Sequence, residues 1–401
     1  MGCFSAVKVT DRVWWVGAID WNLREFHGYQ TGRGSTYNAF LVLDDKVTLI
    51  DTVKAPFFEE MRDRIASVID PAKIDYIVSN HAEMDHSGAL PRAIAEFQPE
   101  KVFCSVMGEK ALRAHFGAAL PVTAVKTGET LALGTNTLKF IETRMLHWPD
   151  SMASYLSGER VLFSQDAFGM HMAGSGRFAA DYDKGVLYEE ARSYFANILL
   201  VQAPKVAALL DDLAPLLPEV EIIAPDHGPI WCGERAEVLE WYRGFSAGKP
   251  EKRAVVLYDT MWHSTEKMAN AVADGIIAAG VPAEVICLHA ASRSAAMTRI
   301  MNAGILAVGT PTLNNNLYPS LADCLTYARG LRPTIALGAT FGSFGWSGEG
   351  AKQAAEYLAQ MKIEQPEPPL SVKYVPDADV LARCRELGGR LGAALLAKLN
   401  A

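Results

Sequence analysis

The sequence predicts an α/β protein with two domains, a layered αββα domain over residues 1–249 and a doubly wound parallel sheet over residues 250–401. The 401 residues and the hydrophobic content of 50% are enough for two separate cores. Strand-like and helix-like segments mix irregularly in the first part and alternate regularly in the second. The change falls at "GKPEKR", residues 248–253, which is short, charged and contains Gly and Pro as a domain linker does.

The first domain opens with alternating apolar segments and frequent turns, and helices appear between its later strands. Alternation bounded by turn residues is typical of strands, and an apolar stripe at helical spacing is typical of helices. The expected strands are 11–20, 37–45, 46–53, 74–80, 101–106, 137–145, 160–168 and 221–228, and the expected helices are 90–97 and 108–116. This mixture favours a layered domain over a helical bundle.

The second domain repeats one unit, in which an apolar strand is followed by an amphipathic helix. The expected strands are 253–260, 283–289, 305–312, 334–342 and 370–375, and the expected helices are 264–280, 294–304, 319–331, 347–360 and 377–399. Strands that read as continuous apolar runs are buried on both faces. Five such units predict a doubly wound parallel sheet.

The overall composition favours a small-molecule substrate or a protein partner. The formal net charge is -8 and the pI is about 5.7, which argues against nucleic acid or an anionic membrane as the main partner. No apolar run approaches the roughly 20 residues that span a bilayer. The six cysteines are scattered without a C-x-x-C pair. This spacing argues against an internal rubredoxin-type iron site and indicates reduced thiols in a cytoplasmic protein.

Metal-capable side chains crowd the stretch "NHAEMDHSGALP", residues 80–91, directly after an expected strand. Others lie at or just after later strand ends, so that one sheet edge is expected to present them together. The full set is His81, Glu83, Asp85, His86, His147, Asp166 and His227. Seven ligands exceed the four of a tetrahedral zinc and suit two metals that share a carboxylate. Taken alone, residues 80–91 also fit a solvated polar loop.

This H-x-E-x-D-H pattern, followed by His, Asp and His, resembles the metallo-β-lactamase fold. Hydrolases of that fold usually carry His where this sequence has Glu83. A further anionic oxygen favours a harder, redox-active metal such as iron over zinc. The pattern with Glu is similar to the di-iron domain of flavodiiron proteins. That resemblance implies one iron held by His81, Glu83 and His147, a second held by Asp85, His86 and His227, and Asp166 as the bridge.

Three loops at strand ends of the second domain are candidates for a flavin site. A flavodoxin-like sheet binds FMN at the carboxyl ends of its strands. Hydroxyl groups and backbone amides at a helix N-terminus suit a phosphate, although such loops are more often N-caps, and Trp side chains suit stacking on a flat ring. The candidate residues are Thr260, Met261, Trp262, His263, Ser264 and Thr265 on the first loop, Pro311, Thr312, Asn314 and Asn315 on the second, and Ser343, Phe344, Gly345 and Trp346 on the third.

The chain as a whole resembles the A-type flavodiiron proteins, also called rubredoxin:oxygen oxidoreductases. "VGAIDWN", "ETRMLHWPDSM" and "YDTMWHSTEKMA" are among the stretches that carry this resemblance. His263 stands where standalone flavodoxins usually have Gly, and flavodiiron proteins share this variant. The resemblance implies FMN and two iron ions per chain, with O2 reduced to water or NO reduced to nitrous oxide.

The same resemblance implies a head-to-tail homodimer or dimer of dimers and a separate rubredoxin-like electron donor. His27 and Tyr194 are expected beside the irons, either as hydrogen-bonding groups or as satisfied core residues. His171 is expected either to line the pocket or to have a structural role. Two other functions fit parts of the sequence. One is a zinc hydrolase with a flavodoxin-like regulatory domain, and the other is an electron carrier in which only the flavin works.

Overall fold

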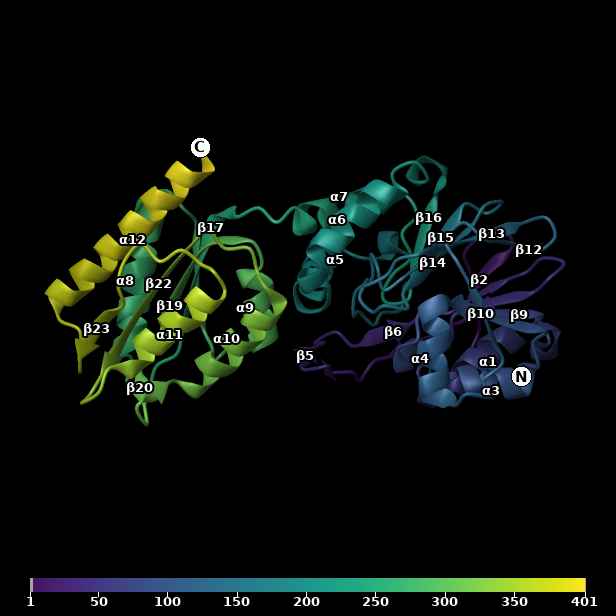
Figure 1. The fold of residues 1–401 in the computed structure, drawn as a ribbon, viewed down its shortest axis with the longest axis horizontal. Coiled ribbons are helices and arrows are strands. Elements are labelled where there is room, and N and C mark those ends of the chain that lie inside the picture. Colours follow the sequence, from purple (N-terminus) through teal and green to yellow (C-terminus); the bar gives the residue numbers. More distant parts are fainter. Residues whose placement is uncertain (1–2, 401) are drawn as a thin grey trace. The chain divides into compact units, whose positions relative to one another are not determined.

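The computed structural model describes residues 3–400 (Figure 1). The chain forms two compact units. The first comprises the residues up to Tyr194 together with Gln202–Ser246, and the second comprises Phe195–Val201 together with the residues from Ala247 onward.

The first unit contains two main sheets. The seven-stranded sheet has the order β1 (Val7–Lys8), β2 (Val13–Trp15), β7 (Phe40–Val42), β8 (Thr48–Ile50), β9 (Tyr76–Ser79), β10 (Lys101–Ser105) and β11 (Val122–Val125). The five-stranded sheet has the order β12 (Thr130–Ala132), β13 (Thr137–Glu142), β14 (Met152–Leu156), β15 (Val161–Gln165) and β16 (Ile222–Pro225). Two small ribbons pair β3 (Ala18–Asp20) with β6 (Ser35–Tyr37) and β4 (Glu25–Phe26) with β5 (Tyr29–Gln30).

The two main sheets face one another across an apolar core. Phe40 packs on Phe163 with ring centroids 5.2 Å apart, and Phe103 approaches Phe140 at 6.1 Å. Each of these pairs joins one sheet to the other, which confirms the predicted αββα sandwich. The helices are α1 (Phe58–Ala66), α2 (Met84–Ser87), α3 (Leu90–Phe97), α4 (Val106–Phe116), α5 (Lys184–Tyr194), α6 (Ala203–Leu213) and α7 (Arg235–Ser246). Figure 1 shows α5, α6 and α7 on the side of β14–β16.

The second unit is a five-stranded parallel sheet. Its order is β18 (Ala283–Cys287), β17 (Glu251–Tyr258), β19 (Ala303–Gly309), β22 (Leu337–Phe344) and β23 (Leu370–Lys373), with a small hairpin of β20 (Thr312–Leu313) and β21 (Asn316–Leu317). This 2-1-3-4-5 order is that of flavodoxin-like folds, as predicted. All seven residues of the central strand β19 are buried. Burial on both faces explains its continuous apolar sequence.

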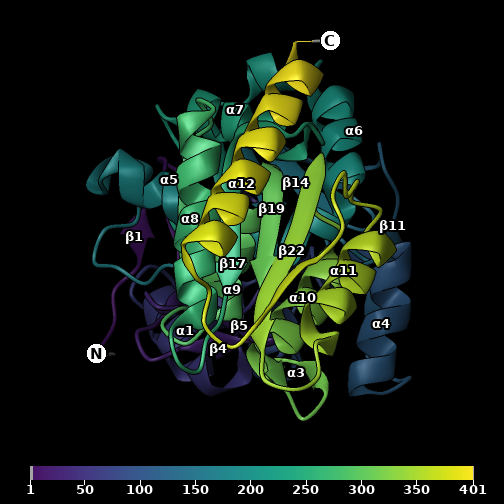
Figure 2. The same cartoon turned by 90° about the vertical axis from the view of Figure 1, so that its left-hand side faces the viewer.

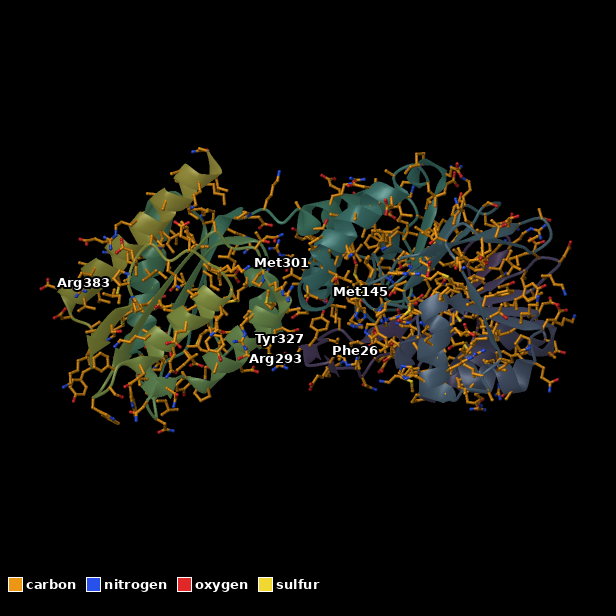
Figure 3. All side chains as sticks on the ribbon, in the orientation of Figure 1. Phe26, Met145, Arg293, Met301, Tyr327 and Arg383 are labelled. Carbon is orange, nitrogen blue, oxygen red and sulfur yellow. The ribbon has the colours of Figure 1, made fainter. Side chains whose placement is uncertain are left out.

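Helices cover both faces of this sheet. They are α8 (Ser264–Ala278), α9 (Arg293–Ile300), α10 (Pro319–Leu331), α11 (Glu349–Gln360) and α12 (Ala378–Leu399). Figure 2 shows α8 and α12 side by side in front of β17, β19 and β22. Figure 3 labels Arg293 of α9 and Tyr327 of α10, where the guanidinium lies 5.1 Å from the ring centroid.

The expected linker, residues 248–253, is shorter in the structure than the composition predicts. Strand β17 already begins at Glu251, which pairs with Ala303 of β19. The Arg253 guanidinium donates to the backbone carbonyls of Arg299 and Met301. These contacts attach residues 251–253 to the sheet. The charged residues and the Pro therefore did not locate the end of the linker correctly.

One helical stretch among residues 3–400, Lys184–Leu213, is long and apolar enough to span a membrane by length and composition. In the structure, 56% of its most apolar 18-residue window is buried. Core helices of soluble proteins have the same length and composition, so this stretch is only weak evidence of a membrane span.

Asp44 ties the turn between β7 and β8 to the turn between β12 and β13. Its carboxylate accepts hydrogen bonds from the backbone amides of Asp45, Thr135 and Asn136 at 2.8–3.0 Å, and from Asn136 Nδ2 at 2.8 Å. Burial alone would raise the pKa of the Asp44 carboxyl, but these hydrogen bonds lower it to about 2 from an ordinary 3.8. Asp44 therefore stabilises the fold through its ionised form.

We expect Asp44→Asn to lower the free energy of unfolding by about 2 kcal/mol at pH 7, because a neutral amide cannot accept all four bonds. A carboxyl with a depressed folded-state pKa stabilises the fold fully above its unfolded pKa, and this stabilisation is lost as pH falls toward the folded value. The difference between wild type and variant should therefore shrink between pH 4 and pH 2. Urea unfolding at a series of pH values measures it. A difference that stays constant with pH would contradict this role.

Candidate metal centre and flavin cavity

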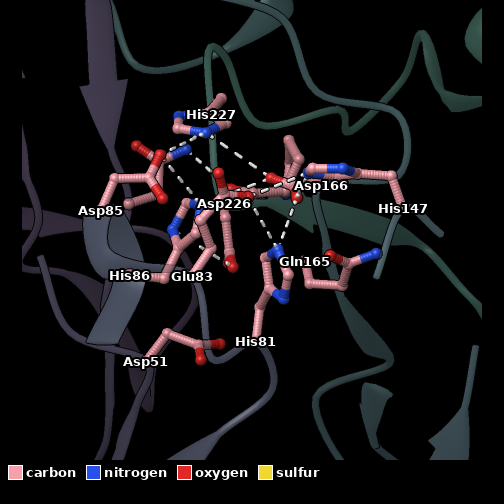
Figure 4. Close-up of polar contacts among 12 residues, drawn as sticks. Asp51, His81, Glu83, Asp85, His86, His147, Gln165, Asp166, Asp226 and His227 are labelled. Carbon is pink, nitrogen blue, oxygen red and sulfur yellow. Dashed lines mark hydrogen bonds and ion pairs between the residues drawn. The ribbon is translucent and has the colours of Figure 1, made fainter. Parts of the chain in front are cut away.

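The structure brings the seven predicted metal-capable residues into one buried cluster of the first unit (Figure 4). They form two groups, and within each group the ligand atoms lie within 4.8 Å of one another. The groups are His81, Glu83, His147 and Asp166, and Asp85, His86 and His227. A single sheet edge holds for His147, Asp166 and His227, but not for the whole set of seven. His81 to His86 follow β9 of the seven-stranded sheet, whereas His147, Asp166 and His227 follow strands of the five-stranded sheet.

Asp166 lies between the two groups. Its Oδ2 is 3.2 Å from His81 Nε2 and 3.3 Å from His147 Nε2. Its Oδ1 is 3.4 Å from His86 Nε2 and 3.5 Å from His227 Nε2. Each oxygen of this carboxylate thus faces a different group, which is the geometry that a bridging ligand needs.

The outer ligands of each group close the arrangement. Glu83 Oε2 lies 3.2 Å from His81 Nε2 and 3.0 Å from His147 Nε2. In the other group, Asp85 Oδ2 lies 3.2 Å from His227 Nε2 and 3.4 Å from His86 Nε2. In both groups, carboxylate oxygens and imidazole nitrogens therefore point toward a common centre.

The cluster fits metal cations because several of its buried polar atoms make no hydrogen bond to the described residues. Both carboxylate oxygens of Asp85 and of Asp166, and both ring nitrogens of His86, lack a hydrogen bond to the described residues. Leaving a buried charge uncompensated costs several kcal/mol. A cation between these oxygens supplies the missing compensation, so the residues present suit two metal ions.

The electrostatics of the cluster favour carboxylates over carboxylic acids. Burial would raise the pKa of the Asp166 carboxyl, but His81 and His147 hold that pKa well below its usual range. Burial would lower the pKa of His147, but Asp166 and Glu83 raise it to about 9. A metal ion therefore competes with protons for the imidazole nitrogens.

Supporting residues that no sequence pattern marks orient the ligand imidazoles. His81 Nδ1 lies 3.0 Å from Asp150 Oδ2, which also accepts from the Ala82 amide at 2.6 Å. His227 Nδ1 donates to the Thr36 carbonyl at 2.6 Å. These contacts fix the tautomers that leave Nε2 facing the cluster. Asp150 lies in the "HWPDS" stretch three residues after His147, but its partner His81 is remote in sequence.

We expect Asp150→Asn to weaken metal binding about 10- to 100-fold, because an amide no longer enforces the Nδ1–H tautomer of His81. Competition with a chelator, followed by metal analysis, measures the affinity. Asp211→Asn, on the exposed face of α6, is the matched control and should leave metal affinity unchanged. Equal metal affinity in both variants would contradict the orienting role.

The structure places His27, Tyr194 and His171 around the cluster. His27 Nε2 lies 2.5 Å from Glu83 Oε1, and this hydrogen bond raises the pKa of His27. The Tyr194 ring is buried, with its centroid 6.2 Å from that of His227. His171 is buried with Nδ1 2.8 Å from Ser35 Oγ and its ring 4.5 Å from His227. Phe26, labelled in Figure 3, packs on His27 at 4.2 Å.

The second unit contains a cavity of about 570 Å³ at the carboxyl ends of its strands. Its size is within the range of small-molecule sites. It is lined by Thr260, Met261, Trp262, Ser264, Pro311, Thr312, Leu313, Asn314, Asn315, Ser343, Phe344, Gly345, Trp346, Ser347, Tyr374 and Val375. The three predicted loops therefore meet at one cavity, and of the predicted residues only His263 and Thr265 are outside this lining. Tyr374 and Val375, which follow β23, were not predicted.

Two indoles at this cavity are almost fully exposed. Trp262 has 87% of its surface accessible and Trp346 has 88%. Exposed Trp side chains on a concave site suit a flat aromatic ligand that covers them. His263, outside the lining, has a left-handed φ of 63°. Gly adopts this conformation without the strain that a side chain brings.

Comparison with known proteins places both units in described families. A model of the ODP family beta lactamase matches residues 36–228, and a flavodoxin model matches residues 256–388. The chain is 45% identical to a rubredoxin-oxygen oxidoreductase of Megalodesulfovibrio gigas, over 99% of this chain and 100% of that protein. It is 42% identical to a nitric oxide reductase of Moorella thermoacetica, over 96% of this chain and 98% of that protein.

Solved structures agree over the full length. The structure of the rubredoxin oxygen:oxidoreductase from Desulfovibrio gigas has a TM-score of 0.96 and 45% identity, covering 99% of this chain and 100% of that one. The flavodiiron protein from Giardia intestinalis has a TM-score of 0.94 and 32% identity, covering 99% and 98%. The chain belongs to the flavodiiron protein family. The family is one of oxidoreductases, so this flavodiiron protein is an oxidoreductase, and its two units are the metallo-β-lactamase-like and flavodoxin-like domains of the family.

Proposed function

We propose that this flavodiiron protein reduces O2 to water or NO to nitrous oxide at two iron ions, with electrons delivered through FMN. The observation that carries the proposal is Asp166, whose two oxygens each face a separate group of ligands. The names of its relatives, an oxygen oxidoreductase and a nitric oxide reductase, support both substrates. Four electrons and four protons balance the first reaction, and two of each balance the second.

We propose that His81, Glu83 and His147 hold one iron, that Asp85, His86 and His227 hold the other, and that Asp166 bridges them. Iron fits this set because three of the seven side chains are hard carboxylates. When bound, the irons bind and reduce the gas and the flavin supplies electrons. The chain's own residues keep the ligands aligned: His27 holds the outer oxygen of Glu83, and Asp150 holds His81. Tyr194 lies beside His227 and is proposed to border the gas site.

FMN is proposed to occupy the cavity of the second unit. The three loops supply hydroxyl groups and amides for a phosphate and the indoles of Trp262 and Trp346 for the ring. The proposed contacts are the fourteen predicted residues on the three loops together with Tyr374 and Val375.

A separate rubredoxin-like protein is the proposed electron donor. A relative in Escherichia coli, 37% identical over 96% of this chain, is named a flavorubredoxin, and the match covers 81% of it. We also propose that the protein forms a head-to-tail homodimer or a dimer of dimers. We propose a cytoplasmic location, because the six cysteines are free thiols. The proposed domain boundary lies between residues 249 and 250.

Metal analysis and gas turnover test the proposal together. The purified protein should contain about two iron and one FMN per chain, and the anaerobically reduced protein should consume O2 or NO when the two are supplied at matched concentrations. The ratio of the two rates gives the preferred substrate. Zinc in place of iron, with thioesterase or lactonase activity and no gas consumption, would overturn the proposal in favour of a hydrolase.

A further inference from the structure

A short loop, residues 259–263, joins β17 to α8 and forms one side of the flavin cavity. Thr260, Met261 and Trp262 of this loop line the cavity. His263 ends the loop as the N-cap of α8, but its side chain makes no capping hydrogen bond to the helix. The backbone carbonyl of His263 accepts from the Lys267 amide at 3.2 Å, so the helix begins here without help from that side chain.

Glu266, in the first turn of α8, joins both ends of this loop. Its Oε2 lies 2.7 Å from His263 Nδ1, at the end of the loop. Its Oε1 accepts a hydrogen bond of 3.1 Å from the hydroxyl of Tyr258, the last residue of β17. One carboxylate thus connects the strand before the loop to the residue that closes it.

A second carboxylate, Asp259, anchors the start of the loop. Its Oδ1 accepts from the Thr260 amide at 2.8 Å, and its Oδ2 accepts from the Ser320 hydroxyl. Asp259 is 1% exposed, so this anchor is a core contact. Glu266 provides the corresponding contact at the other end, on the side that faces solvent.

The negative charge of Glu266 has the same sign as the phosphate of the proposed ligand. A flavin phosphate at the start of α8 is an anion at a helix N-terminus, where backbone amides favour it. A carboxylate in the same turn repels that anion. The helix N-terminus by itself favours glutamate here, but repulsion by a bound phosphate opposes it. The two hydrogen bonds to the loop are the contribution that Glu266 makes to the site in spite of this repulsion.

We propose that Glu266 is a positioning residue for the phosphate of the flavin. Its hydrogen bonds to Tyr258 and His263 form a clamp that fixes the loop between them, and this loop receives the phosphate. The inference rests on the proposed FMN site. The clamp is expected to affect phosphate binding more than ring binding, because Trp262 is on the clamped loop whereas Trp346 and Tyr374 are on other loops.

Flavin titrations of the full chain, stripped of flavin, test the clamp with two variants and two ligands. Glu266→Ala removes both hydrogen bonds, and we expect the Kd for FMN to rise about tenfold while the Kd for riboflavin, which shares only Trp262 of this loop, rises by a clearly smaller factor. Glu266→Gln keeps one acceptor and one donor and removes the charge, so it should bind FMN at least as tightly as the wild type. Glu356→Ala, on the exposed side of α11, is the matched control and should change neither Kd.

The outcomes separate the clamp from simple repulsion. If the carboxylate only repels the phosphate, both Glu266 variants bind FMN more tightly than the wild type, and the inference is overturned. An equal loss of FMN and riboflavin affinity in Glu266→Ala also overturns it, because the effect would then be a general one on the domain. Wild-type protein that binds neither flavin overturns the proposed function together with this inference, whereas wild-type binding with an unaffected Glu266→Ala overturns the inference alone.

Discussion

Replacing Asp166 with alanine is expected to remove gas reduction, with turnover falling by more than about a hundredfold. Loss of a partner that only supports a metal ligand costs about 10- to 100-fold in metal affinity or activity. Asp166 faces both ligand groups, with contacts of 3.2–3.5 Å to four imidazoles, so its loss affects both metals at once. Metal content and O2 and NO turnover by the reduced variant are the measurements.

The flavin serves as an internal control in this experiment. Asp166 belongs to the first unit and the flavin cavity to the second, so the variant should keep its flavin. Asp166→Asn separates charge from position, because its single carbonyl oxygen can serve only one group, and we expect it to retain less metal than the wild type. Full turnover by metal-depleted Asp166→Ala would show that the flavin alone reduces the gas and would exclude the metal cluster as the reaction site.

Residue type and strand ends were enough to predict the seven metal-capable residues, because a short loop after a strand limits where its side chains can lie. His147, Asp166 and His227 were found in the same way. The sequence could not show that they come from a different sheet than His81, since pairing partners depend on tertiary packing. Asp150 was missed for the same reason: its partner is 69 residues away, and no local pattern marks a carboxylate that orients a remote imidazole.

The second domain was predictable in more detail because its units repeat. The apolar runs predicted the strands, and the amphipathic segments between them, such as the one that ends at Gly280, predicted the helices. The ends of the strands predicted three of the four loops that line the cavity. Tyr374 and Val375 were missed because the last strand carries no Gly or hydroxyl pattern after it. Glu266 reads in sequence as an ordinary acidic residue in a first helical turn. Only the folded structure shows its hydrogen bonds with Tyr258 and His263.

A single methyl group at Gly388 is expected to destabilise the second unit. A Cβ at this position of α12 would lie 2.0 Å from the Val272 carbonyl oxygen and 2.9 Å from the Ile276 amide of α8. Both neighbours are backbone atoms that cannot rotate away, so Gly388→Ala must push the two helices apart. Overpacking of this kind costs about 1–3 kcal/mol.

Gly389, the next residue of α12, provides a matched control for this substitution. A Cβ there meets only the Gly275 carbonyl oxygen at 3.9 Å, an ordinary contact. Alanine is favoured over glycine inside a helix by up to about 1 kcal/mol, so Gly389→Ala should be neutral or stabilising. The thermal midpoint of the chain and amide hydrogen exchange in α8 and α12 measure both variants. Because both carry the same change in helix propensity, equal shifts would mean that α8 and α12 do not pack as closely as Gly388 requires.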